Sequence, residues 1–161
     1  MDAVAEQVSA KAGPDDLILV QPWYAGIGFA RYYHGSTPWM IVPDLDTRLF
    51  QPYGAFKQRM SALHPIAAEL ERIGATLRAG QRVWLVGGLQ TLRSGETWTE
   101  LAPAPESPAG WREPAYTAQW SRAIARAVHA DARVVRRVSA PDLGPVFPAE
   151  DLALLVAEGR R

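Results

Sequence analysis

The chain has 161 residues, of which 48% are hydrophobic, and its 17 acidic side chains balance its 17 basic ones. A chain of this length and composition predicts one domain with its own core, and the zero net charge argues against nucleic acid as a partner. The absence of cysteine excludes disulfides, thiolate metal sites and cysteine nucleophiles. No apolar run approaches the roughly 18–20 residues of a membrane span, so we expect the isolated chain to be soluble.

In the N-terminal part of the chain, segments with the apolar spacing of a helix alternate with segments that have the apolar pattern of a buried strand. Val4, Val8 and Ala12 recur at helical spacing, whereas the runs 17–20 and 39–42 are continuously apolar, as in strands buried on both faces. The order predicted for this part is helix 2–12, strand 17–20, helix 25–34, strand 39–42 and helix 55–63.

The next predicted helix is the clearest in the chain. Its apolar residues form one narrow stripe: Ile66, Leu70, Ile73 and Leu77. After it the sequence predicts a strand over 82–86, a long proline-rich surface loop over 89–111, a helix over 116–130, and strands over 133–138 and 152–156. Strands that alternate with helices predict an open, mostly parallel α/β sheet of about five strands. We expect helices on both faces, in a three-layer, Rossmann-like arrangement, and a single domain over residues 1–161.

Glycine and polar residues follow the predicted strands, at the edge where open α/β sheets bind ligands. Gly26 and Gly28 follow the first strand, and glycines in such a turn let backbone N–H groups approach a phosphate. With Asp44 as a ribose-binding acid, the pattern weakly suggests a nucleotide- or NAD(P)-binding site. However, Arg31 occupies the position of the third glycine, and Gly26 lies six residues after the strand. Packing of the helix against the sheet explains both glycines more simply.

Aromatic residues are concentrated in the turn and helix after the first strand. Rings with polar edges stack on sugar faces and also meet lipid headgroups, so the cluster is a candidate binding surface. Phe29 and Tyr33 share one face of the predicted helix, and at least half of the cluster is expected to be core. Trp23 and Tyr24 lie in the turn and are expected to be exposed.

Charged residues offer no catalytic set. Asp44, Asp46 and Arg48 combine paired carboxylates with a cation, an arrangement able to bind a divalent ion or to serve acid–base chemistry. Solvated loop charges are the commoner explanation, so we predict neither a metal nor a cofactor. Asp15 and Asp16 look like turn residues before the first strand.

Residues 15–48, DDLILVQPWYAGIGFARYYHGSTPWMIVPDLDTR, resemble part of the soluble C-terminal domain of large bacterial membrane glycosyltransferases. These enzymes resemble protein O-mannosyltransferases and aminoarabinose transferases and use polyprenyl-phosphate-linked sugars. The pattern PWYxGxxFxRYY is the most specific part of the match. RVWLVGG (82–88), PAPESPAGW (103–111) and EDLALLVAEG (150–159) extend the resemblance over nearly the whole chain.

The resemblance implies an accessory domain that is not catalytic by itself, since no part of this chain corresponds to the catalytic acid between the first membrane helices of such enzymes. Its location would be the extracytoplasmic face of the bacterial inner membrane. Its partners would be the membrane domain of the same enzyme and a polyprenyl-phosphate sugar or glycan acceptor. Arg31 can bind a phosphate or carboxylate in such a patch. The residues expected to face a sugar or an interface are Trp23, Tyr24, Arg31, Tyr32 and Tyr33.

Two alternatives stay open. The first is a small nucleotide- or NAD(P)-dependent enzyme that uses Gly26 and Gly28. The second is a stand-alone protein-interaction domain, suggested by a helical stripe of Arg122, Arg126 and His129. A solvated helix face is the simpler explanation of that stripe.

Overall fold

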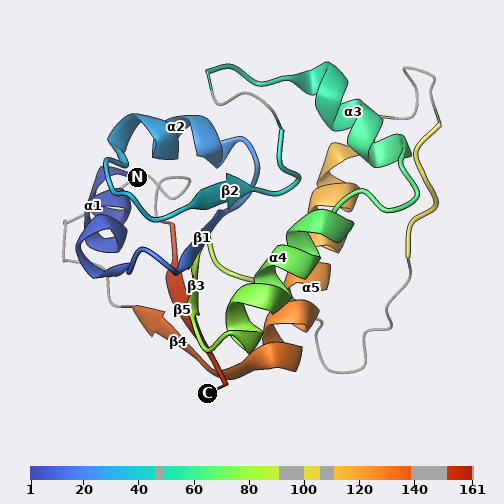
Figure 1. Cartoon of the computed structure of the whole chain (residues 1–161). Helices are drawn as coiled ribbons and strands as arrows, with labels where there is room; N and C mark the ends of the chain where they lie inside the picture. The colour runs from blue at the N-terminus through green and yellow to red at the C-terminus, as the bar shows by residue number, and fades with distance from the viewer. Residues whose placement is uncertain (46–48, 91–99, 106–110, 139–151, 161) are drawn as a thin grey trace.

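The computed structural model describes residues 1–45, 49–90, 100–105, 111–138 and 152–160. Its centre is an open, five-stranded sheet in the order β2-β1-β3-β5-β4 (Figure 1). The strands are β1 (Leu17–Val20), β2 (Trp39–Ile41), β3 (Arg82–Val86), β4 (Ala132–Val138) and β5 (Leu154–Gly159). The predicted α/β sheet of about five strands is thus confirmed.

The sheet is mixed, which refines the expectation of a mostly parallel one. β1 pairs in parallel with β2 and with β3, whereas β5 lies antiparallel to both β3 and β4. β5 is inserted between β3 and β4, although β4 precedes it in the sequence, and it alone runs against the other strands. The parallel half, β2-β1-β3, brings three carboxyl ends to one edge of the sheet.

The described helices are α1 (Asp2–Lys11), α2 (Ala25–Tyr32), α3 (Tyr53–Ser61), α4 (Ala67–Arg78) and α5 (Glu113–Asp131). Figure 1 shows α1 and α2 on one side of the strands and α4 and α5 on the other. α4 packs against β3 and β5, and α5 packs against α4 and β4. α3 contacts α5 through Phe56 and Trp120, whose ring centroids are 5.3 Å apart.

The core follows the predicted apolar patterns. The strands predicted over 17–20 and 82–86 are confirmed with unchanged bounds, and every other predicted element lies within about three residues of the observed one. Every residue of β1 is buried. Ile73 and Leu77 of the predicted stripe lie on the inner face of α4 and are completely buried. In the described part of the chain, none of the helices has the length and hydropathy of a membrane span.

The described residues of the predicted loop over 89–111 form no helix or strand. Three hydrogen bonds attach residues 100–105 to α3 and α5, and the first runs from the Leu101 N–H to Gln119 Oε1 at 2.6 Å. The Ala104 backbone N–H donates to the Met60 carbonyl at 2.8 Å, and the Tyr116 hydroxyl donates to the Ala102 carbonyl at 2.7 Å. This segment therefore ties the end of α3 to the first turns of α5.

Candidate functional site

A cleft of about 400 Å³ opens at the carboxyl ends of β1 and β3, against the first turns of α5. The parallel strands end at this edge, where open α/β sheets bind ligands, so the cleft lies where the sequence predicts a site. No lysine or arginine is among the described residues that line it. The side chains that give the cleft its chemistry are Gln21, Tyr24, Gln90, Glu113, Thr117 and Ser121.

One side of the cleft is built by Gln21 and the glycine turn after β3. The Gln21 backbone N–H donates to the Val86 carbonyl at 2.9 Å, and its side-chain amide donates to the Gly88 carbonyl. Gly87 has a φ of 100°, and a Cβ there would lie 1.6 Å from the Gln21 carbonyl oxygen. Only glycine lets the two strand ends approach this closely.

The opposite side comes from the first turns of α5, with side chains whose positions are set by hydrogen bonds. Glu113 Oε1 accepts hydrogen bonds from the Trp23 indole N–H and from the Thr117 hydroxyl, both at 3.1 Å. The Ser121 hydroxyl oxygen accepts from the Gln90 backbone N–H at 3.2 Å. The cleft thus presents amides, hydroxyls and one carboxylate whose orientations are largely determined by the protein itself.

Sequence reasoning missed the α5 side of this cleft. The available signal was an acidic residue followed by Pro114 near a helix start, which marks many helix starts and says nothing about ligands. Glu113, Thr117 and Ser121 also lie far from β1 in sequence. Only the packing of α5 beside the strand ends brings them to Gln21.

Trp23 is buried, which corrects the prediction that both aromatic residues of the first turn are exposed. Only 3% of Trp23 is accessible, and its ring packs on Phe56 with 4.6 Å between centroids. The cover comes from α3, which is distant in sequence. Tyr24 agrees with the prediction, because it is 50% exposed and lines the cleft.

The other residues of the predicted patch do not line the cleft. Tyr33 is buried and stacks on Phe29, with 4.9 Å between ring centroids. Arg31 and Tyr32 lie in the last turn of α2, where the Arg31 guanidinium carbon is 5.7 Å from the Tyr32 ring centroid. Tyr24 is the N-cap residue of α2. The structure therefore separates Tyr24 from Arg31, Tyr32 and Tyr33 by the length of α2.

Asp44 is held by its backbone beside a buried carboxylate. Its N–H donates to Glu69 Oε1 at 2.8 Å, and its carbonyl accepts from Arg59 Nη2 at 2.8 Å. Glu69 is only 3% exposed and lies 3.6 Å from Arg59. Asp46 and Arg48 lie outside the described residues. Among the described residues, no three His, Asp or Glu side chains form a group that could hold a metal ion.

Gly26 and Gly28 lie where α2 meets its neighbours, and neither is among the residues that line the cleft. A Cβ on Gly26 would lie 2.3 Å from Ile41 Cγ2, so this glycine lets α2 approach β2 closely. A Cβ on Gly28 would lie 3.6 Å from Met1 Cγ, which is an ordinary contact. This geometry favours helix packing over phosphate binding as the reason for Gly26, and it does not require glycine at Gly28.

Gly26→Ala should therefore lower the free energy of unfolding by roughly 1–3 kcal/mol, because Ile41 has to move to admit the new methyl group. Gly28→Ala should change it by less than about 1 kcal/mol, in the stabilising direction, because alanine has the higher helix propensity. Urea unfolding of both variants beside the wild type measures the difference. Equal effects of the two substitutions would contradict the packing role of Gly26.

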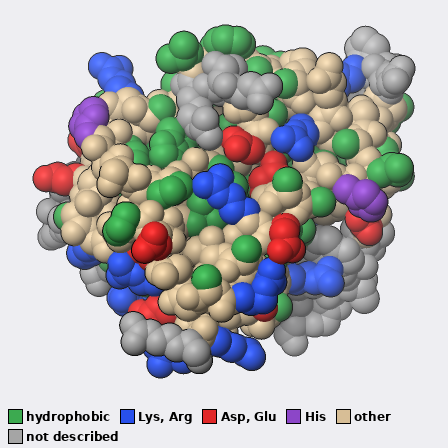
Figure 2. Space-filling view, viewed as in Figure 1, with side chains coloured by type: hydrophobic (Ala, Val, Ile, Leu, Met, Phe, Trp, Pro, Cys, Tyr) green, Lys and Arg blue, Asp and Glu red, His purple; other side chains and the backbone are tan. Residues whose placement is uncertain are grey.

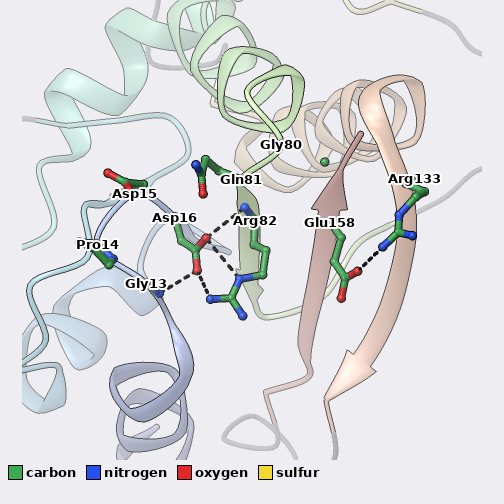
Figure 3. A pocket seen from close by; sticks show the side chains of 10 residues that line it. Gly13, Pro14, Asp15, Asp16, Gly80, Gln81, Arg82, Arg133 and Glu158 are labelled. Carbon is green, nitrogen blue, oxygen red and sulfur yellow. Dashed lines mark hydrogen bonds and ion pairs between the residues drawn. The ribbon is translucent and has the colours of Figure 1, made fainter. Parts of the chain in front are cut away.

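A second cavity, of about 630 Å³, lies at the opposite edge of the sheet, between the starts of β1 and β3 and the end of β5 (Figure 3). Asp16 lies in its wall with only 4% exposure. Asp16 accepts hydrogen bonds from the Gly13 N–H at 2.8 Å and from the Trp84 indole at 2.9 Å. It also accepts from the Arg82 N–H at 3.1 Å and forms an ion pair with Arg82 Nη2 at 2.8 Å.

Four of the five charged residues that line this second cavity pair with one another, Asp16 with Arg82 and Glu158 with Arg133. Glu158 accepts hydrogen bonds from Arg133 at 3.1 Å and from Arg136 at 3.2 Å. Burial raises the pKa of Asp16, but the hydrogen bond from Trp84 and the others just described outweigh it, so the pKa lies below its ordinary value. We therefore assign Asp16 to holding the turn before β1 against β3, and take the first cleft as the candidate binding site.

Neither family models, nor curated proteins, nor solved structures match this chain. The chemistry of the cleft is therefore the main observation that bears on function. Among the described lining residues, that chemistry is hydrogen bonding by uncharged groups, with a single carboxylate and one accessible ring.

Proposed function

We propose that this chain is the accessory domain of a bacterial membrane glycosyltransferase and that it binds carbohydrate in the cleft at the carboxyl ends of β1 and β3. The observation that carries the proposal is the lining of the cleft. It combines amides and hydroxyls with the half-exposed ring of Tyr24, and its described part contains no basic side chain. A ligand with many hydroxyl groups and apolar ring faces, which is a carbohydrate, matches that combination.

The polar groups suit hydroxyls because they can both donate and accept. The Gln21 and Gln90 amides offer donors and acceptors, and the Thr117 hydroxyl retains lone pairs after donating to Glu113. Glu113 uses Oε1 for its two protein donors. Its Oε2 has no hydrogen-bond partner within the described residues, so it can accept a charge-assisted hydrogen bond from a sugar hydroxyl.

The charge of the lining favours the glycan acceptor over the phosphate part of a polyprenyl-phosphate donor. A bound phosphate usually meets arginine, lysine or a cluster of backbone N–H groups. Here the charged side chain is Glu113, which would repel a phosphate. The same charge counts against a nucleotide or NAD(P) as the ligand of this cleft.

The proposal assigns binding, and not bond cleavage, to this cleft. Hydrolysis of a glycosidic bond generally uses two carboxyl groups placed on either side of the bond. Glu113 is the one carboxylate among the described lining residues, and its position is determined by Trp23 and Thr117. We therefore expect the catalytic groups to reside in another part of the enzyme.

The segment with the most specific resemblance contributes directly to the cleft. Residues 15–48 include β1, the turn with Trp23 and Tyr24, α2 and β2. A sugar-binding role for this turn would give that sequence pattern a physical reason. We extend the proposal to a three-layer, Rossmann-like scaffold on the extracytoplasmic side of the inner membrane, docked to the membrane half of the same enzyme.

Tyr24→Ala and Glu113→Gln should each weaken sugar binding about tenfold, because a lost stacking ring or charged acceptor is worth about 1–2 kcal/mol. A glycan array probed with the whole chain identifies sugars that bind, and isothermal titration calorimetry then gives the dissociation constants. The substitutions leave buried groups in place, so the melting temperature should change little.

Tyr32→Ala is the matched control, because it removes a tyrosine of similar exposure at the far end of α2. We expect it to leave sugar affinity unchanged. A loss of affinity in Tyr32→Ala with none in Tyr24→Ala would move the site from the cleft to the α2 surface. A melting temperature raised by NAD(P), with no sugar bound by the array, would favour the nucleotide-dependent enzyme instead.

A further inference from the structure

Three aromatic side chains are exposed beside the cleft: Tyr24, Tyr53 and Trp111, with accessible fractions of 50%, 54% and 39%. We call these three residues the aromatic rim. They come from the turn after β1, from the start of α3 and from the segment just before α5. Several large rings left accessible in one area of a surface mark a place where a partner binds.

The rim is supported by buried rings. The Trp23 ring centroid lies 6.1 Å from that of Tyr24 and 5.7 Å from that of Tyr53. Trp111 lies 5.8 Å from Tyr53 and 5.7 Å from Phe56. Since Trp23 and Phe56 are themselves in contact, the five rings form one connected cluster. The exposed rings are therefore already in place before a ligand arrives, which lowers the entropy cost of binding.

The rim borders the cleft on two sides. Tyr24 belongs to both, because it lines the cleft and contacts Trp23. Trp111 lies two residues before Glu113, whose carboxylate accepts the Trp23 indole N–H. Figure 2 shows hydrophobic side chains at the upper edge of the molecule, over the segment that leads into α3. Because Tyr24 belongs to both the cleft and the rim, a ligand that occupies the cleft can extend onto the rim.

We infer that the ligand is an oligosaccharide whose first unit occupies the cleft and whose following units stack on the aromatic rim. This inference rests on the proposed sugar binding and adds the length of the ligand. Sugar rings present C–H groups on their faces and hydroxyls on their edges. Tyrosine and tryptophan match both, because their faces are apolar while the tyrosine hydroxyl and the indole N–H form hydrogen bonds.

The same observations favour a glycan over a lipid surface as the partner of the rim. The rim continues into a cleft lined by amides, hydroxyls and a carboxylate. A lipid chain entering that cleft would leave those polar groups without hydrogen-bond partners, which is costly. A glycan meets the polar cleft and the apolar rings with complementary groups at once.

A length series of one sugar tests the inference. Wild-type chain is titrated by calorimetry with the mono-, di-, tri- and tetrasaccharide of the homo-oligomer that gives the strongest signal on an array of mannose, glucose and galactose oligomers. We expect the tetrasaccharide to bind at least about tenfold more tightly than the monosaccharide, because each further sugar unit adds a stacking contact with the rim. Trp111→Ala should lower tetrasaccharide affinity five- to tenfold and leave monosaccharide affinity unchanged. Trp111→Phe, which keeps an aromatic ring, should retain most of the tetrasaccharide affinity.

Leu63→Ala is the matched control, since it removes an exposed apolar side chain just beyond the end of α3 and should alter neither affinity. Equal wild-type affinities along the series, with Glu113→Gln weakening all of them, would overturn the oligosaccharide inference and keep the sugar-binding proposal. Binding of no sugar on the array would overturn both. Binding to vesicles of bacterial phospholipids that is lost in Trp111→Ala would assign the rim to a membrane surface and also overturn the inference.

Discussion

Trp23→Ala is expected to lower the free energy of unfolding by about 3–5 kcal/mol, the range typical of removing a buried aromatic side chain. Trp23 is 3% exposed, and its ring contacts Tyr24, Tyr53 and Phe56. The substitution removes all three ring contacts and the indole donor to Glu113. Small domains have only about 5–15 kcal/mol of stability, so the loss should move the urea midpoint far toward lower concentration. Urea unfolding followed by circular dichroism measures it.

Two further variants separate the parts played by the Trp23 ring and its N–H group. Trp23→Phe retains a ring and loses the hydrogen bond, so we expect a smaller cost than for Trp23→Ala. Trp111→Ala removes the same side chain from a position that is 39% exposed, and its cost should also be clearly smaller. If Trp23→Ala and Trp111→Ala unfolded at the same urea concentration, Trp23 could not be the centre of the aromatic cluster.

Asp16→Asn is expected to lower the free energy of unfolding at neutral pH by about 2–4 kcal/mol. The substitution breaks a buried ion pair, and the new side-chain NH₂ group would face N–H groups that need an acceptor. Asparagine keeps the shape of aspartate but turns one acceptor oxygen into an N–H group. Both carboxylate oxygens of Asp16 accept hydrogen bonds: Oδ2 from the Gly13 N–H and the Trp84 indole N–H, and Oδ1 from the Arg82 N–H. The Arg82 side chain is 37% exposed, so water compensates part of the loss.

The stabilisation that Asp16 gives to the folded state should decrease as the pH becomes acidic. Its pKa in the folded protein is held below the ordinary value of 3.8, so the folded state favours the charged form. The stabilisation is complete above the unfolded pKa and is lost as the pH falls from there through the lowered folded pKa. The gap between wild type and Asp16→Asn should therefore narrow below about pH 4. Urea unfolding at a series of pH values measures it.

Asp15→Asn is the matched control for this prediction. Asp15 precedes Asp16 in the same turn and is exposed, so its substitution should change the stability little at any pH. A constant difference between wild type and Asp16→Asn from neutral to acidic pH would contradict a lowered pKa. Equal effects of Asp15→Asn and Asp16→Asn would contradict the assignment of Asp16 to the contact between β1 and β3.

The aspartates before β1 also illustrate where sequence reasoning stopped. The turn interpretation of Asp16 is partly correct, because its carboxylate accepts the Gly13 N–H three residues earlier. Its bonds to Arg82 and Trp84 could not be predicted, since those residues lie more than sixty positions later. A local pattern identifies a turn, whereas a partner across the sheet depends on which strand becomes the neighbour.

Trp23 and Glu113 show the same limit at the candidate site. The sequence predicts the turn after β1 and places a ligand site at its edge of the sheet, and the cleft lies there. It gives the wrong exposure for Trp23, because the rings that cover it, Tyr53 and Phe56, belong to the distant helix α3. It offers no reason to select Glu113, whose role depends on meeting Trp23 and the strand ends in space.

The sequence by itself determined the order and approximate bounds of the helices and strands, because apolar spacing is a local property that each segment carries alone. It also predicted the edge of the sheet at which the cleft lies, because that edge follows from the parallel direction of β1, β2 and β3. Only the tertiary structure decided that β5 lies antiparallel between β3 and β4, because strand pairing is a contact between distant segments. For the same reason only the tertiary structure decided that Trp23 is buried and that its indole N–H meets Glu113.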